Sequence, residues 1–146
     1  MRNFCSLLKY LFILLFFFLI TNAITSQVTG HWNTTGPGDE KENSIVEIYE
    51  QHGKFYGKIV KLPPSATGSL CDKCPGDLKG KPIEGMVVLN DLTKTSSGGK
   101  NGTVLDPATG KSYNCFIELN GADKLQVKAY VGSPAFGKSQ YWYRMK

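Results

Sequence analysis

Two cysteines three positions apart carry the clearest chemical potential in this sequence. They are Cys71 and Cys74, in the stretch LCDKCPGD from residue 70 to 77, and the other cysteines are Cys5 and Cys115. A Cys-x-x-Cys pair can bind zinc, act as a redox dithiol or form a small disulfide loop. The compartment and the elements that hold the pair decide between these chemistries.

Zinc and redox chemistry are the less favoured interpretations. A structural zinc ion takes four ligands, and the sequence offers only His31 and His52 as imidazoles, both expected at the surface. A redox dithiol needs its first thiol at a helix N-terminus, whereas Pro75-Gly76 stops a helix directly after Cys74. We therefore expect no metal, no cofactor and no catalytic residue.

A disulfide is the main expectation, and its pairing stays open. Joining Cys71 to Cys74 closes a short loop worth about 2 kcal/mol, whereas joining either to Cys115 closes a long one worth about 4 kcal/mol. The long bridge stabilises more, but close spacing favours the local bridge kinetically. Once Cys5 is removed with the signal peptide expected below, either bridge leaves one thiol free.

The N-terminus indicates export. Arg2 and Lys9 precede the apolar run YLFILLFFFLI, and small and polar residues follow it. This pattern is typical of a secretory signal peptide, and the run is shorter than the roughly 20 residues that span a membrane. We expect a signal peptide over residues 1–26, a single domain over 27–146, a periplasmic or secreted location, and no stable membrane span after cleavage.

Composition argues against nucleic acid as a partner. The chain has 146 residues and a formal net charge of +5, which falls to +3 without Arg2 and Lys9. The remaining lysines are scattered among acidic residues, whereas nucleic-acid binding usually needs a concentrated basic stripe.

Period-two patterns and frequent breakers predict an all-β fold. We expect an antiparallel up-and-down barrel, because closure removes the edges that so small a sheet would expose. The eight expected strands are 28–35, 44–50, 54–62, 83–90, 102–106, 111–119, 124–131 and 138–145. The segment 93–102 is low in apolar residues and is expected to be a mobile loop.

The stretch DPATGK from Asp106 to Lys111 predicts a tight turn. Asp106 can accept backbone N–H groups, Pro107 presets φ, and Gly110 can adopt the left-handed conformation. Asp106 and Gly110 are therefore expected to be structural residues.

Residues at both ends of the expected domain carry a family resemblance. Gly30-His31-Trp32 on the first strand, with Arg144 on the last, resembles the lipocalin-type arrangement, in which the arginine covers the tryptophan ring and plugs the barrel. Such a cation over an indole is worth about 0.5–2 kcal/mol. The resemblance implies that Trp32 and Arg144 are structural.

A longer set of motifs is similar to the exported bacterial family called domain of unknown function 2147. The set comprises Gly30-x-Trp32, Gly57-x-Ile59-Val60, Gly85-Met86, Gly102-x-x-x-Asp106-Pro107-x-x-Gly110-Lys111-x-Tyr113, Leu125-x-Val127 with Tyr130 and Gly132, and Gly137-x-x-Gln140-x-Trp142-x-Arg144. Ala129 departs from the glycine that members often carry. The resemblance implies a β-barrel in the envelope or outside the cell, and no reaction.

The favoured functional hypothesis is a binding module for a small apolar or amphipathic ligand, because small exported barrels can hold such ligands at one end. Strand parity suggests Phe116, Tyr130, Gln140 and Trp142 as lining residues. The alternatives are an envelope protein that docks another protein, and a thiol-redox protein that uses Cys71 and Cys74.

Overall fold

The chain folds into a closed antiparallel β-barrel, as expected from the sequence. The computed structural model describes residues 27–36 and 43–146, so the expected signal peptide lies outside the described residues. Each strand pairs with the next along the chain, and β8 pairs with β1. The strands are β1 (Gly30–Asn33), β2 (Ile45–Gln51), β3 (Lys54–Lys61), β4 (Val87–Lys94), β5 (Gly98–Asp106), β6 (Lys111–Leu119), β7 (Lys124–Tyr130) and β8 (Lys138–Arg144).

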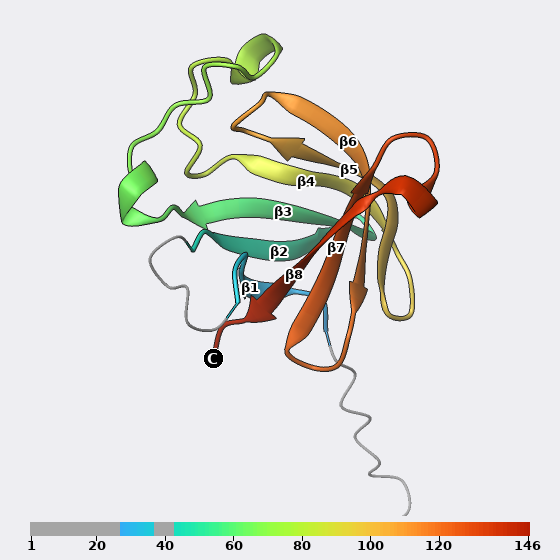
Figure 1. Ribbon diagram of the computed structural model, residues 1–146. Coiled ribbons are helices and arrows are strands. Elements are labelled where there is room, and N and C mark those ends of the chain that lie inside the picture. Colours follow the sequence, from blue (N-terminus) through green and yellow to red (C-terminus); the bar gives the residue numbers. More distant parts are fainter. Residues whose placement is uncertain (1–26, 37–42) are drawn as a thin grey trace, which may run out of the picture.

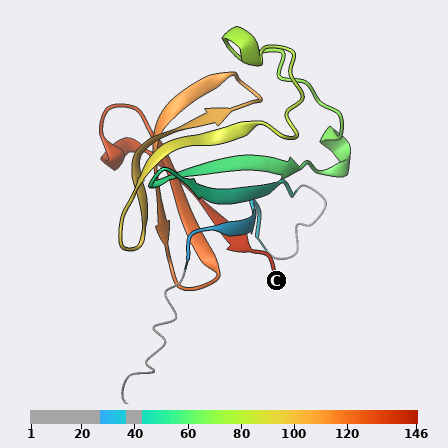
Figure 2. The same cartoon turned by 180° about the vertical axis from the view of Figure 1, so that it is seen from behind.

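The connections between strands differ at the two ends of the barrel (Figure 1). One end, which we call the tight end, carries the short turns β2–β3, β4–β5 and β6–β7. The other, the open end, carries the short turn β5–β6 and the longer connections β3–β4 and β7–β8. These longer connections contain the 3-10 helices η2 (Pro64–Ala66), η3 (Gly76–Leu78) and η4 (Pro134–Phe136). Figure 2 shows the connection 62–86, in green, extending beyond the strands. Within the described part of the chain, no helix is long and apolar enough to cross a membrane.

Large side chains fill the half of the barrel next to the tight end. Phe55, Leu92, Ile117 and Leu125 lie near the ends of their strands there, and all are buried. Their neighbours in sequence point outward because successive strand residues face opposite sides of a sheet. Each such side chain contributes about 1.5–3 kcal/mol through burial, so this half acts as the hydrophobic core.

The β4–β5 hairpin differs from the sequence prediction. Strand β4 begins four residues later than expected, and β5 begins at Gly98 rather than at 102, so most of the expected loop 93–102 is strand. Glycine made this segment resemble a loop, but its role is to provide space. A Cβ on Gly102 would lie 2.5 Å from the carbonyl oxygen of Asn90 and 2.6 Å from Leu92 Cγ. The glycine therefore allows close packing in the filled half.

Arg144 closes the tight end. Its guanidinium carbon lies 4.3 Å from the centre of the Trp32 ring, a cation–π contact. Its Nε donates to the carbonyl of Ala122 at 2.9 Å, and Nη1 donates to that of Thr29 at 3.1 Å. Nη2 donates to the carbonyl of Gln27. One side chain thus joins the N-terminal segment, β1 and the β6–β7 turn.

The Gly30-x-Trp32 motif fits this closure. Gly30 has φ of +127°, and a Cβ there would lie 3.0 Å from Arg144 Nη1. A side chain at residue 30 would therefore be strained and would crowd the guanidinium. The Trp32 indole N–H donates to the carbonyl of Val28 at 2.9 Å, which fixes the ring beneath the arginine.

Of the two disulfide pairings that the sequence left open, the structure contains the local one. Cys71 and Cys74 are joined within the connection 62–86. Cys115 is a free thiol inside the barrel, with none of its surface exposed. It points inward from β6, between Gly102 on β5 and Ala129 on β7. Burial raises the pKa of its thiol to about 12, because the thiolate would lose its hydration.

We predict that Arg144→Met lowers the free energy of unfolding by about 2–4 kcal/mol, since it removes the cation–π contact and three hydrogen bonds. Arg144→Lys should recover little of this, because an ammonium cannot reproduce the planar fork of donors. Urea unfolding measures both effects. Lys146→Met is the matched control, because this side chain is exposed and its ion pair with Asp123 is long, at 3.8 Å. Equal stabilities for the Arg144→Met and Lys146→Met variants would contradict the assigned role.

We predict that the folded protein comprising residues 27–146 shows no reactive thiol and that the same chain, when unfolded, shows one, Cys115. Since folding raises this pKa from 9.0 to about 12, the unfolded state loses the proton first as the pH rises. The contribution of Cys115 to stability is therefore complete below pH 9.0 and declines toward pH 12. The Cys115→Ala variant should lose less stability over that range than the wild type. Rapid labelling of the folded protein at neutral pH would refute the prediction.

Candidate functional site

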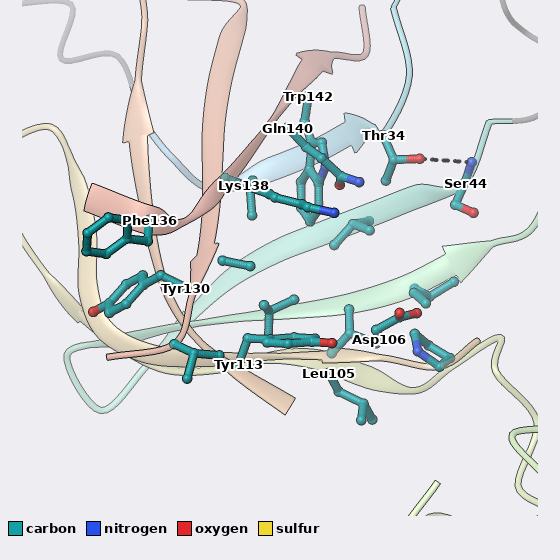
Figure 3. Close-up of a pocket in the computed structure, with 18 residues that line it drawn as sticks. Thr34, Ser44, Leu105, Asp106, Tyr113, Tyr130, Phe136, Lys138, Gln140 and Trp142 are labelled. Atoms are coloured by element: carbon teal, nitrogen blue, oxygen red, sulfur yellow. Dashed lines mark hydrogen bonds between the residues drawn. The ribbon is translucent and has the colours of Figure 1, made fainter. Parts of the chain in front are cut away.

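A cavity of about 730 Å³ occupies the half of the barrel next to the open end. Its volume lies within the range of roughly 300–1,000 Å³ that is usual for small-molecule sites. Figure 3 shows the lining side chains surrounding the space between β8 and the opposite strands. The lining residues are Thr34, Ser44, Val46, Ile59, Val88, Val104, Leu105, Asp106, Pro107, Tyr113, Val127, Ala129, Tyr130, Val131, Phe136, Lys138, Gln140 and Trp142.

Branched aliphatic side chains form much of the wall. Val46, Ile59, Val88 and Val127 each come from a different strand and are all buried. They lie toward the open end of strands whose opposite ends contribute larger core residues. Because valine is smaller than the phenylalanine and leucine of the filled half, the space between these strands is not occupied by the protein itself.

Strand β8 supplies a different wall. Lys138, Gln140 and Trp142 are alternate residues of this strand, so all three face the interior. Figure 3 shows Lys138 and Gln140 extending from β8 toward the centre of the cavity. Ser139 and Tyr141 have the opposite parity, and Ser139 accepts a hydrogen bond from Gln126 on the outer face at 2.9 Å. Lys138 begins the strand at the mouth, and Trp142 lies deepest.

Three of the four residues suggested from parity line this cavity. They are Tyr130, Gln140 and Trp142. Phe116 does not, because its neighbours Cys115 and Ile117 point inward and Phe116 therefore points outward. Its ring lies 6.4 Å from that of Tyr130. Tyr130 has the outward parity as well, and it reaches the cavity because it ends β7 at the mouth.

Sequence reasoning missed two features of this site. Lys138 has the same parity as Gln140 on the last strand, so its inward position could have been inferred. The rim residues Val131 and Phe136 lie in the β7–β8 connection, where no strand parity applies. They are 74% and 87% exposed, which makes them the most exposed large apolar residues of the described chain.

The polar groups in the cavity wall differ in whether they have hydrogen-bond partners within the protein. Asp106 Oδ1 accepts from the Ala108 N–H at 3.0 Å, and Oδ2 accepts from the Thr109 hydroxyl at 2.8 Å. The Trp142 indole N–H is buried and has no acceptor among the residues that the structure describes. An unpaired buried donor costs about 1–3 kcal/mol. Trp142 thus lines the cavity while its indole nitrogen is shielded from solvent.

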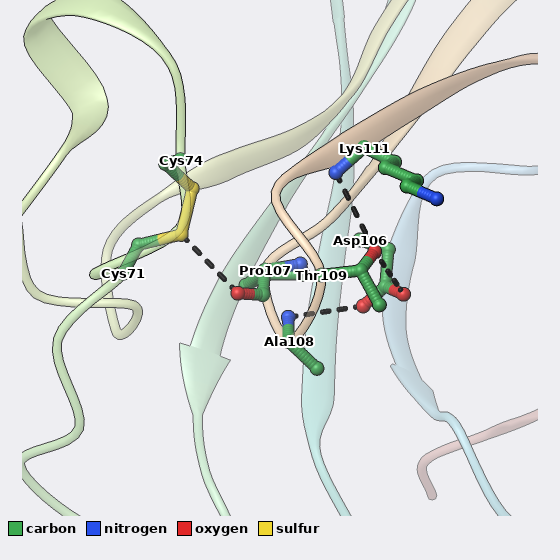
Figure 4. Close-up of a disulfide and its surroundings, with 7 residues drawn as sticks. All are labelled: Cys71, Cys74, Asp106, Pro107, Ala108, Thr109 and Lys111. Carbon is green, nitrogen blue, oxygen red and sulfur yellow. Dashed lines mark hydrogen bonds between the residues drawn. A yellow bond between two sulfur atoms is a disulfide. The ribbon is translucent and has the colours of Figure 1, made fainter.

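The disulfide loop packs against the turn that forms part of this wall. Figure 4 shows the Cys71–Cys74 bridge next to the turn 106–111, with Cys71 Sγ 3.3 Å from the Pro107 carbonyl oxygen. Gly110 has φ of +70°, and a Cβ there would lie only 1.8 Å from the Lys73 carbonyl oxygen. Gly110 thus serves both the turn and the close approach of the loop. The bridge consequently supports the wall at Asp106 and Pro107.

Displaced pKa values also occur on the outer face, away from the cavity lining. The Tyr56 hydroxyl donates to Asp91 Oδ1 at 2.9 Å, which raises the pKa of Tyr56 and lowers that of Asp91. Lys54 also contacts this oxygen, at 3.2 Å. Among residues 27–36 and 43–146, no group of three His, Cys, Asp or Glu side chains is placed to hold a metal ion.

Comparisons with known proteins agree with this architecture. A solved structure from Helicobacter pylori, protein HP1028, which is described as belonging to the lipocalin family, is 25% identical to this chain. The match covers 84% of this chain and 85% of that one, with a TM-score of 0.73. A search of curated proteins found no match. Residues 30–144 match the family model described as an uncharacterized protein conserved in bacteria, DUF2147. The chain therefore belongs to the DUF2147 family.

Proposed function

We propose that this protein is an exported binding module that holds a small apolar or amphipathic molecule in the barrel cavity. The observation that carries the proposal is the size and chemistry of this cavity. An eight-stranded barrel is narrow enough for its own side chains to fill it, and the half next to the tight end is filled in that way. The open half instead has aliphatic walls around about 730 Å³.

The mouth is suited to the entry of such a molecule. Phe136 and Val131 expose apolar surface at the rim, where they would otherwise be unfavourable in water. The Trp142 ring offers a flat apolar surface at the inner end. The description of the Helicobacter pylori protein as a lipocalin agrees with a ligand-binding role for this fold.

Export supports the same assignment and rests on two independent features. The residues before position 27 have the pattern of a signal peptide, and the Cys71–Cys74 disulfide suits an oxidising compartment. A thiol-redox role has less support. The bridged sulfurs are buried, Cys71 completely, and exchange requires access to a sulfur atom.

Docking of an envelope protein is the second candidate function. The observation in its favour is the connection 62–86, which exposes Leu70 and Leu78. Binding of a protein there and of a small molecule in the cavity are compatible, because these leucines do not line the cavity.

We predict that the neutral apolar dye N-phenyl-1-naphthylamine binds the wild type and gains fluorescence. Ala129→Phe should weaken this binding by at least about tenfold, because the ring would occupy space that the dye needs; tenfold corresponds to about 1.4 kcal/mol. Ala122→Phe is the matched control, since residue 122 is exposed at the tight end. Unfolding by urea establishes that both variants are folded.

Two results would contradict the proposal. One is an absence of dye binding to the wild type, and the other is equal dye affinity in the folded Ala129→Phe variant. Native mass spectrometry of protein from its own host gives an independent measurement, because a retained small molecule appears as an added mass that Ala129→Phe should diminish.

A further inference from the structure

The two charged side chains that line the cavity differ in whether they have hydrogen-bond partners within the protein. Lys138 and Asp106 are the charged side chains among the described lining residues. Both carboxylate oxygens of Asp106 accept hydrogen bonds from the turn that follows, so this carboxylate already has partners within the protein. No hydrogen bond or ion pair involves the Lys138 ammonium within residues 27–36 and 43–146. The mouth therefore presents one cation that has no partner there.

The position of this cation defines where a ligand's polar end would lie. Lys138 is the first residue of β8, at the mouth, and Gln140 faces the cavity two residues further in. Gln140 adds an amide, which can donate beside the ammonium. Beyond it the cavity is bounded by Trp142, Val46 and Val127, all buried. The polar groups of β8 thus lie near solvent, and the apolar surface lies inside.

The change from polar groups at the mouth to apolar surface inside favours an amphipathic molecule that binds with its polar end at the mouth. An apolar chain gains by leaving water for the inner wall, at about 25 cal/mol per Å². An anionic group would lose hydration at the same depth, but at the mouth it stays hydrated and meets the ammonium. A cationic head would be repelled by Lys138, and a neutral head would gain only an ordinary hydrogen bond.

We propose that the cavity binds a monoanionic amphipath, of which an aliphatic carboxylate is the simplest, with its head at Lys138 and Gln140 and its chain against the valines of β2, β4 and β7. The proposal rests on the binding function argued above and adds the ligand's charge and orientation. Lys138 is the specificity-determining residue, because it distinguishes a carboxylate from a neutral molecule of equal chain length.

The experiment compares decanoate with 1-decanol, each below the concentration at which it aggregates, as competitors of N-phenyl-1-naphthylamine. The wild type should bind decanoate at least about fivefold more tightly than 1-decanol, as expected for a charge-assisted hydrogen bond near water. Lys138→Gln should abolish this preference by weakening the binding of decanoate at least about fivefold, because the amide carries no charge. Lys138→Arg should retain it.

Lys111→Gln is the matched control for long-range charge effects. Lys111 begins β6 at the same end of the barrel, carries the same charge and does not line the cavity. This variant should keep the decanoate preference, and the preference of the wild type should weaken as salt is added.

The outcomes separate this proposal from the binding function. If the wild type binds the dye but binds decanoate and 1-decanol equally, the proposal of an anionic head group is wrong and the binding function stands. If the Lys138→Gln variant still prefers decanoate to 1-decanol, Lys138 does not determine the specificity. Failure of the dye and of both competitors to bind would overturn the binding function and this inference together.

Discussion

The contact between the Arg144 guanidinium and the Trp32 ring holds the barrel closed. The last strand and the first share only a short ladder, in which Trp32 pairs with Arg144 and Asn33 with Tyr143. So short a pairing gives little stability by itself, because each exchanged hydrogen bond contributes only about 1 kcal/mol net. The arginine reinforces it from the tight end by donating to three carbonyl groups, two in the segment before β1 and one in the β6–β7 turn.

Sealing one end allows the other to stay open. Large core residues, the indole and the guanidinium together fill the half next to the tight end, so the fold does not depend on a packed interior throughout. The wall of the open half can then be lined by valines that leave a cavity. A barrel of this size supports both arrangements, since the choice depends on the volume of alternate inward residues.

The open end is shaped by elements outside the sheet. Burial anchors the connection 62–86 at Leu62 and Met86, whereas its 3-10 helices contain no buried residue. The disulfide and the close approach of Lys73 to Gly110 fix it on the turn 106–111. The wall at Asp106 and Pro107 is thereby braced from outside, while the rim at Phe136 remains exposed.

The sequence by itself determined the features that depend on local pattern. Alternation and turn residues specified the all-β class, most strand positions and the turn at Asp106–Gly110, because pleat parity and backbone conformation act over a few residues. The tertiary structure decided what depends on space between distant strands. It left Cys115 as a buried free thiol, turned Phe116 outward and made a glycine-rich segment into strand β5. It also left a cavity, because the volume between the walls depends on the side chains of several strands together and cannot be inferred from any one strand.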